Sequence, residues 1–338
     1  GMGYSWQFAL TAVLIEGLIF IVLTITNVRE AIVEAIPLSL RRAIGVGIGL
    51  FITFIGFNSA GVIVNNDATL VGLGDITSGS ALLALIGLII TGLLYMRGIP
   101  GSILIGILIT MLIGIPMGVT EFKGLVSHPE SISSICCKFE WDHIFSIDML
   151  IIVFTFFFID MFDTVGTLIG VCTKSHMVDE NGNIRRLKQA FMADAIATTV
   201  GAILGTSTTT TYVESAAGVA QGGRSGLTAF SIACCFAVAL FFSPLFLSIP
   251  AAATAPALII VGLLMMTPIT QIPFDDFSEA VPAFVCIVMM PFSYSISNGI
   301  LLGMISYVLM NMICGKFKKL TPAMYILAVL FILKYIFI

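Results

Sequence analysis

Two aspartates three residues apart lie in a strongly apolar stretch and could do chemistry there. Asp160 and Asp163 follow a run of phenylalanines and isoleucines, and Thr164 and Thr167 continue the polar positions. In a helix, this spacing places both carboxyl groups on one face. A carboxylate inside a membrane costs at least about 2.5 kcal/mol, so it usually marks a substrate or proton pathway. The pair therefore predicts a binding site, with anchoring hydrogen bonds between helices as the structural alternative.

A second segment, 205–223, combines two different local patterns. Four consecutive threonines, Thr208–Thr211, favour an extended strand, whereas the small residues of 215–220 favour a short helix. Irregular backbone at membrane depth is tolerated only where it is buried in protein or lines a cavity, and discontinuous helices build substrate sites in secondary transporters. Glu214 falls in the first turn of the predicted half-helix, where the free N–H groups attract an acceptor. A threonine-rich loop is the alternative.

The composition places these segments in a lipid environment. Hydrophobic residues make up 58% of the 338 residues and charged residues only 10%, against about 25% charged residues in soluble proteins. The mean hydropathy of +1.10 agrees. A cytosolic enzyme, a disordered chain and a secreted disulfide scaffold are excluded. The fifteen basic residues form no long cluster, which excludes a nucleic-acid binder.

A membrane-crossing helix needs about 20 apolar residues. The candidate spans are 6–26, 41–57, 80–96, 99–118, 148–172, 190–204, 226–248, 255–267, 279–292 and 296–314, and a further apolar segment, 322–338, closes the chain. Several of these spans are short, which indicates tilt or burial inside a helix bundle. The expected fold class is an all-α polytopic membrane protein.

The basic residues orient the predicted spans. If successive spans cross the membrane in alternating directions, with 212–222 counted as one crossing, each connecting loop is assigned to one side. One side then contains only Lys123 and Lys138, and Lys334 lies inside the last segment. The other side, expected to be cytoplasmic, receives twelve basic residues: Arg29, Arg41, Arg42, Arg97, Lys174, Arg185, Arg186, Lys188, Arg224, Lys316, Lys318 and Lys319. No Lys or Arg is expected at the membrane midplane, which disfavours an anionic substrate.

Enzymatic and metal chemistry are disfavoured. Gly72 to Asp75 matches a GxGD string of intramembrane aspartyl proteases, but it lies in a loop and precedes the helical aspartates. Asp160 and Asp163 share one helix, whereas an acid pair for peptide cleavage would need two facing helices. The cysteine spacing fits neither a zinc site nor a disulfide framework. Glu16 and Asp194 have no partner recognisable from sequence, and Asp194 is interpreted as an ordinary helix-start acid.

Several motifs identify a family resemblance. The strings FDTVGTL at 162–168, LGTSTTTTYVESAAGV at 204–219 and GGRSG at 222–226 resemble the AzgA-like purine permeases of the nucleobase–cation symporter superfamily. Further matches lie at 49–56, 255–262 and 289–291. The resemblance runs essentially from end to end.

The resemblance implies a transporter fold of fourteen segments in two inverted repeats of seven, with a short strand and half-helix at the substrate site. Core (substrate-binding) pieces would be 6–26 and 148–248, gate pieces 41–118 and 255–314, and 322–338 a C-terminal apolar helix. This chain would hold the fourth through fourteenth segments, so the first repeat would be truncated.

The resemblance also implies import of hypoxanthine, guanine or adenine by proton symport, with alternating access of core against gate and no catalytic residue, metal or cofactor. The purine, protons and the lipid bilayer of the cell membrane would be the partners, a homodimer is allowed, and nucleic acid is not expected. The implied substrate-binding residues are Asp163, Glu214, Tyr212, Thr211 and Thr210, and the implied proton-coupling residues are Asp160, Asp163 and Glu214. Uracil, xanthine or another small solute on the same fold, and a truncated fragment that does not transport, are the alternatives.

Overall fold

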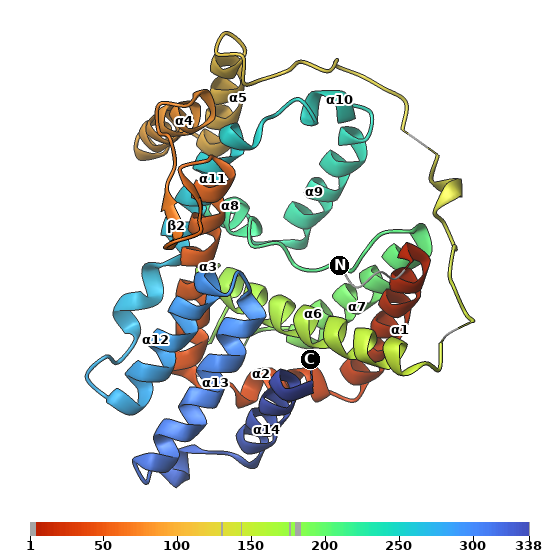
Figure 1. The fold of residues 1–338 in the computed structure, drawn as a ribbon, viewed down its shortest axis with the longest axis vertical. Coiled ribbons are helices and arrows are strands. Elements are labelled where there is room, and N and C mark those ends of the chain that lie inside the picture. The colour runs from red at the N-terminus through yellow and green to blue at the C-terminus, as the bar shows by residue number, and fades with distance from the viewer. Residues whose placement is uncertain (1–4, 130, 143, 176, 180–183, 338) are drawn as a thin grey trace. The chain divides into compact units, whose positions relative to one another are not determined.

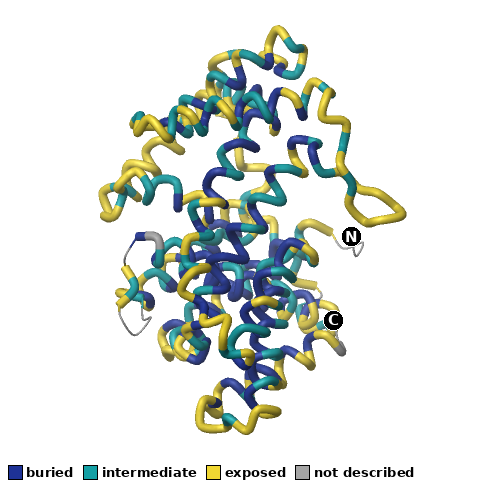
Figure 2. The backbone as a smooth tube through the Cα atoms, turned by 90° about the vertical axis from the view of Figure 1, so that its left-hand side faces the viewer, coloured by how far each residue is buried: buried dark blue, intermediate teal, exposed yellow. Residues whose placement is uncertain are grey.

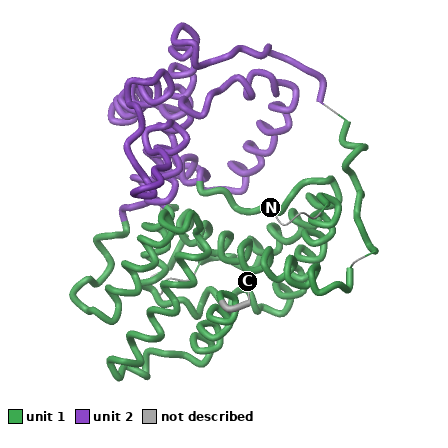
Figure 3. The backbone as a smooth tube through the Cα atoms, viewed as in Figure 1, with its two compact units in different colours: residues 1–48, 131–213, 268–338 green, residues 49–130, 214–267 purple. Residues whose placement is uncertain are grey.

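The computed structural model describes residues 5–129, 131–142, 144–175, 177–179 and 184–337. The chain forms two compact units (Figure 3). The first unit comprises Gly1–Ile48, Ser131–Val213 and Pro268–Ile338, and the second comprises Gly49–Glu130 and Glu214–Thr267. This division does not test the predicted core and gate pieces, which stay a prediction.

The first unit is a bundle of helices (Figure 1). In it α1 packs against α6 and α7, α12 packs against α13, and α13 also contacts α6 and α14. Short 3₁₀ turns lie at Ile132–Ser134 and Phe317–Lys319. Its helices are α1 (Trp6–Ile25), α2 (Val28–Ala35), the start of α3 (Leu38–Ser59), α6 (Ile147–Lys174), α7 (Leu187–Leu204), α12 (Phe277–Phe292), α13 (Ile296–Ile313) and α14 (Pro322–Phe337).

The second unit has its own core, in which Ala60, Leu83, Ala84 and Ala255 are buried together. Here α4 packs against α5, and α11 packs against both. A 3₁₀ turn, Thr267–Gln271, follows the last of its helices. Besides the rest of α3, its elements are β1 (Ile63–Asn66), β2 (Leu70–Leu73), α4 (Gly79–Met96), α5 (Ser102–Gly114), α8 (Ser215–Ala220), α9 (Gly226–Ala239), α10 (Ser243–Phe246) and α11 (Ala251–Met265).

Seven helices in the described part of the chain are long and apolar enough to cross a membrane. They are α1, α3, α4, α6, α7, α13 and the stretch Ala251–Gln271 that begins with α11. Large apolar side chains stay exposed along them, for example Ile89 and Leu93 on α4. Figure 2 shows exposed and buried stretches alternating along the backbone. Apolar surface of this kind suits lipid, and the protein is a multi-pass membrane protein.

Two predicted spans, 99–118 and 226–248, are longer than the helices that form there, whereas the predicted span 279–292 gains two residues at its start as part of α12. The helices α5, α9, α12 and α14 have 13 to 16 residues, or about 20 to 24 Å at 1.5 Å per residue. The predicted span 226–248 is wrong as a single helix, because α9 ends at Ala239 and α10 starts anew at Ser243. Pro244 lies in the first turn of α10, and proline cannot donate the backbone hydrogen bond that would continue α9.

The all-α prediction is corrected by a β-hairpin in the second unit. Strands β1 and β2 pair antiparallel, with Ile63 opposite Leu73 and Asn66 opposite Leu70. The Asn66 side chain accepts hydrogen bonds from the backbone N–H groups of Ala68 and Thr69, which closes the turn. This side-chain capping of a turn is a local device that the apolar spans did not reveal.

The predicted strand at Thr208–Thr211 does not form, whereas the half-helix is confirmed as α8. A strand needs a partner for its ladder of hydrogen bonds, and the described residues provide none here. Instead, the Thr198 hydroxyl on α7 donates to the carbonyl oxygen of Thr209 at 2.9 Å. The segment 206–213 is therefore irregular backbone held by side chains.

A reciprocal glycine–threonine contact holds α4 against α5. A Cβ at Gly106 would lie 2.8 Å from the Cβ of Thr91, and a Cβ at Gly87 would lie 2.7 Å from the methyl group of Thr110. The Thr91 and Thr110 hydroxyls each donate to the carbonyl oxygen of the glycine on their own helix at 2.7 Å. Both hydroxyls are satisfied within their helices, so the two backbones approach closely.

We expect Gly106→Ala to destabilise the protein by about 1 to 3 kcal/mol, because the added methyl group forces the two helices apart. Gly92→Ala on α4 is the matched control, since a Cβ there meets no described atom within 4 Å. Thermal unfolding of the detergent-solubilised protein measures both variants. Equal midpoints for the two would contradict the close helix contact.

An ion-pair network caps the start of α12 in the first unit. The Lys316 ammonium donates to both carboxylate oxygens of Asp276 at 2.8 Å, and Asp276 also accepts from the Ser278 hydroxyl at 2.8 Å. These hydrogen bonds, led by that of Lys316, hold the pKa of Asp276 well below its ordinary value. A lowered folded-state pKa stabilises the fold above the unfolded-state pKa, and the stabilisation is lost as the pH falls.

We therefore expect the stability advantage of the wild type over Asp276→Asn to be full at neutral pH and to shrink below about pH 4, the ordinary range of an aspartate. Unfolding midpoints of both proteins measured across this range test the expectation. Asp275→Asn, at the exposed neighbouring position, serves as control. A difference that grew on acidification would have the wrong sign.

Candidate functional site

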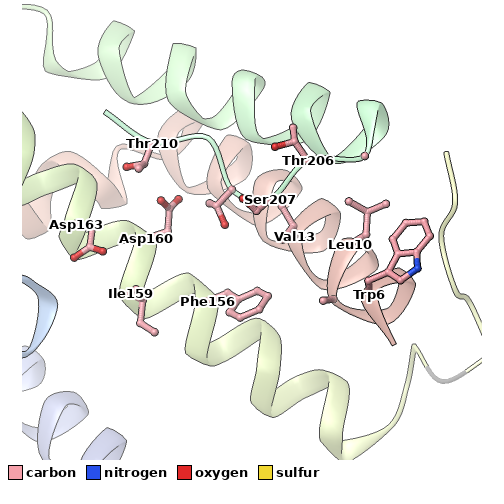
Figure 4. A pocket seen from close by; sticks show the side chains of 13 residues that line it. Trp6, Leu10, Val13, Phe156, Ile159, Asp160, Asp163, Thr206, Ser207 and Thr210 are labelled. Atoms are coloured by element: carbon pink, nitrogen blue, oxygen red, sulfur yellow. The ribbon is translucent and has the colours of Figure 1, made fainter. Parts of the chain in front are cut away.

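The first unit contains a cavity of about 600 Å³ between α1, α6 and the irregular segment after α7 (Figure 4). Its walls combine two carboxyl groups, four hydroxyl side chains and an apolar remainder with two aromatic rings. The lining residues are Trp6, Ala9, Leu10, Val13, Phe156, Ile159, Asp160, Asp163, Gly205, Thr206, Ser207, Thr208 and Thr210. Small-molecule sites commonly have volumes of about 300 to 1,000 Å³.

Helix α6 presents both aspartates to this cavity, as the three-residue spacing predicted. The helix begins at Ile147, where the Ser146 hydroxyl caps it by accepting from the Met149 N–H. Asp160 is only 6% exposed and shares a side-chain hydrogen bond with Thr210. Figure 4 shows the Asp160 carboxyl directed towards the segment that carries Thr210 and Ser207.

The end of α7 positions that segment. Gly205 has φ 93°, a left-handed conformation that glycine adopts without steric cost and that commonly ends helices. The Thr206 N–H then bonds the Gly201 carbonyl at 2.9 Å, which reverses the chain. The Thr210 hydroxyl meets the Thr164 hydroxyl of α6 at 2.7 Å. The threonine run is thus tied to both helices and borders the cavity.

Asp163 has two further electrostatic neighbours. The backbone N–H of Ser297, at the start of α13, donates to its carboxylate, and Lys334 on α14 attracts it. Its Oδ1 atom has no hydrogen-bond partner in the described part of the chain. One oxygen of Asp163 is therefore held in place, and the other is available to a ligand.

The remaining predicted site residues lie outside the lining of this cavity. Thr211 is half-buried, and Tyr212 is 67% exposed. Glu214 is exposed at the N-cap of α8, without a side-chain capping bond, and it is the first residue of the second unit. The grouping of Glu214 with the two aspartates in one site stays a prediction.

Sequence reasoning missed the α1 wall of the cavity and two buried basic side chains. Trp6, Leu10 and Val13 recur at helical spacing, which signals one face of α1 but not a cavity. Arg29, expected in a loop, is 0% exposed and pairs with Asp194, which is thus no ordinary helix-start acid. Lys334, which the orientation of the spans assigned to neither side of the membrane, is buried, with 7% of its surface exposed.

The cavity can bind a neutral polar solute. None of the described residues that line it is Lys or Arg, so it offers no cation for an anionic group. Carboxylates accept N–H groups, and hydroxyls donate or accept. The rings of Trp6 and Phe156 and the side chains of Leu10, Val13 and Ile159 supply apolar contact.

Comparison with known proteins gives consistent similarities. A family model described as "Permease family" matches residues 1–302. A guanine/hypoxanthine permease of Bacillus subtilis is 46% identical over 340 residues, covering 99% of this chain and 76% of the relative. An adenine permease of Escherichia coli is 42% identical over 337 residues, covering 100% of this chain and 76% of the relative. The transmembrane domain of a cyanobacterial bicarbonate transporter shares the fold, with a TM-score of 0.58 at 16% identity over 88% of this chain and 76% of that domain.

Proposed function

This chain belongs to the permease family and is a transporter rather than an enzyme, and on that premise we propose that it carries purine nucleobases across the cell membrane together with protons. The substrates are hypoxanthine, guanine or adenine. The named activities of the bacterial relatives support this substrate class.

The polarity of the cavity carries the proposal. A purine is a flat, uncharged molecule with N–H donors and ring-nitrogen acceptors along its edge. The open oxygen of Asp163 accepts such a donor, and the hydroxyls of Thr206 and Ser207 complement the remaining polar edge. Trp6 and Phe156 cover apolar surface of the rings. None of the described lining residues is basic, so the substrate needs no negative charge to pair with the cavity wall.

The proton is carried by the carboxyl groups of the same site. Asp160 and Asp163 border the cavity from one helix, and Glu214 joins them in the transport cycle. A carboxyl group in a water-poor environment favours its neutral form, so these groups can take up the proton that travels with the substrate. No cofactor is needed beyond the proton gradient.

Alternating access completes the proposal. The core pieces 6–26 and 148–248 move against the gate pieces 41–118 and 255–314, as two inverted repeats. The fold shared with a bicarbonate transporter domain supports a transporter architecture of this kind.

Uptake of labelled hypoxanthine by cells that produce the full-length protein tests the proposal. We expect unlabelled guanine and adenine to compete, uracil, xanthine and bicarbonate to compete weakly, and a protonophore to stop accumulation. If only uracil or xanthine competed, the protein would be a uracil or xanthine permease and the proposed substrates would be wrong. Accumulation that persists with the protonophore would remove proton symport.

A further inference from the structure

We propose that Thr210, Thr164 and Asp194 form a proton relay that connects Asp160 at the cavity with a buried ion pair at Arg29. This inference rests on the proposed function and deepens it, because it identifies the route of the symported proton. It adds three residues outside the cavity, Thr164, Asp194 and Arg29, to the coupling machinery.

A continuous series of side-chain contacts links the two ends. Asp160 shares a hydrogen bond with Thr210, the Thr210 and Thr164 hydroxyl oxygens lie 2.7 Å apart, and the Thr164 hydroxyl lies 3.3 Å from Oδ1 of Asp194. The other oxygen of Asp194 accepts from Nη2 of Arg29 at 2.9 Å. These residues come from α6, the segment after α7, α7 itself and α2.

Beyond the half-buried Thr210, which borders the cavity, the series is shielded from solvent. Thr164 and Arg29 are 0% exposed, and Asp160 and Asp194 are buried. The Arg29 guanidinium lies between the rings of Phe20 and Phe191, at 4.2 and 4.3 Å from their centroids. A buried charge held this way has little contact with solvent, and the Thr164 hydroxyl offers protons a route to Asp194 through side chains.

The charges around Asp194 favour bound protons in this cluster. The guanidinium of Arg29 stays charged. Three carboxyl groups lie close enough to interact with its charge: Asp194 on α7, Asp160 on α6 and Glu16 on α1. Glu16 is fully buried, and neither of its oxygens has a hydrogen-bond partner in the described part of the chain. With one cation and three carboxyls, the cluster is neutral only when two carboxyls hold protons, and buried net charge is costly.

Counting hydrogens shows how the proton moves. The series from Asp160 to Asp194 contains three contacts, and each needs one hydrogen to be a hydrogen bond. The hydroxyls of Thr210 and Thr164 supply two of these hydrogens, so a protonated carboxyl group at one end supplies the third. When Asp160 gives its proton to Thr210, Thr210 passes its own to Thr164, and Thr164 passes its own to Asp194. Each threonine regains one O–H bond for the one it loses. Asp160 ends as a carboxylate and Asp194 as a carboxylic acid, which weakens the ion pair with Arg29.

Among the described residues, Thr164 is the hydrogen-bonded link between Thr210 on the cavity side and Asp194 in the ion pair, and it does not line the cavity. Replacing it by valine keeps its shape and removes the hydroxyl. Coupling should then be lost while substrate binding remains. Thr24→Val is a matched control, because Thr24 is equally buried but its hydroxyl donates only to the Phe20 carbonyl of its own helix, at 2.8 Å.

The test uses the full-length protein in liposomes, with two readouts: exchange of labelled hypoxanthine for unlabelled hypoxanthine, and proton movement that accompanies net hypoxanthine uptake. We expect Thr164→Val to slow hypoxanthine-driven proton movement about 100-fold and to keep exchange within about twofold of wild type. Thr164→Ser, which restores a hydroxyl, and Thr24→Val should keep both readouts. Asp194→Asn, which retains the shape at the end of the relay but removes the proton acceptor and the charge that faces Arg29, should lose hypoxanthine-driven proton movement as Thr164→Val does.

Wild-type proton movement in Thr164→Val or in Asp194→Asn overturns the relay. Equal loss of exchange and proton movement in both variants also overturns it, because the chain of contacts would then serve binding or folding. A wild-type protein that exchanges no hypoxanthine refutes the proposed function itself, a result distinct from failure of the relay.

Discussion

Replacing Asp163 by asparagine, or Glu214 by glutamine, is expected to abolish hypoxanthine uptake and to leave membrane insertion intact. An amide keeps the size of the side chain but replaces an acceptor that carries charge with a neutral group that is half donor. A substrate N–H that loses its acceptor in a buried site costs about 1 to 3 kcal/mol or more, and the proton-carrying group is lost at the same time. Uptake of labelled hypoxanthine, normalised to the amount of protein in the membrane fraction, measures the effect.

Asp148→Asn is the matched control for Asp163→Asn. Asp148 is an exposed aspartate in the first turn of the same helix, α6, and it does not line the cavity. We expect normal uptake from this variant. Normal uptake by both Asp163→Asn and Glu214→Gln would remove the site assignment, whereas loss in only one would assign the substrate to that carboxyl group.

Replacing Arg29 by methionine is expected to destabilise the protein by about 3 to 5 kcal/mol, because Asp194 is left buried without its cation. The guanidinium also donates to the Phe191 carbonyl at 3.2 Å and stacks on two rings. These contacts tie α2 to α7 and α1, so their loss should loosen the first unit. The unfolding midpoint of the detergent-solubilised protein measures the change.

The double variant Arg29→Met with Asp194→Leu separates charge from packing. Removing both partners of a buried pair is often neutral or stabilising, so the double variant should recover much of the lost stability. Arg97→Met, at an exposed position at the end of α4, controls for the loss of an arginine. An unchanged unfolding midpoint in Arg29→Met would show that Asp194 does not depend on Arg29 as its buried cation.

Much of the site could be predicted from local sequence because its signals are local. The three-residue spacing of Asp160 and Asp163 determines their shared face whatever surrounds the helix. The run of small residues before Gln221 indicated the short helix α8, and Gly205 allowed the chain to reverse after α7. The composition alone required a membrane, and seven helices of suitable length agree.

Other features depend on which distant segments meet, and no local pattern contains that information. Arg29 lies 165 positions before Asp194, and only the packing of α2 against α7 brings them together. Lys334 is buried because α14 packs into the first unit, where Phe331 meets the rings of Phe158 and Phe162. The threonine run has the residues of a strand, but a strand requires a partner for its backbone hydrogen bonds.

The sequence by itself thus determined a multi-pass membrane protein with two acids on one helix face, since periodicity and composition act within a few residues, whereas the permease family was implied by the resemblance of its motifs. The tertiary structure decided which of the remaining polar groups join those acids. It placed Thr210 and Thr164 between Asp160 and the Arg29–Asp194 pair, because a buried polar group is stable only where packing supplies its partner.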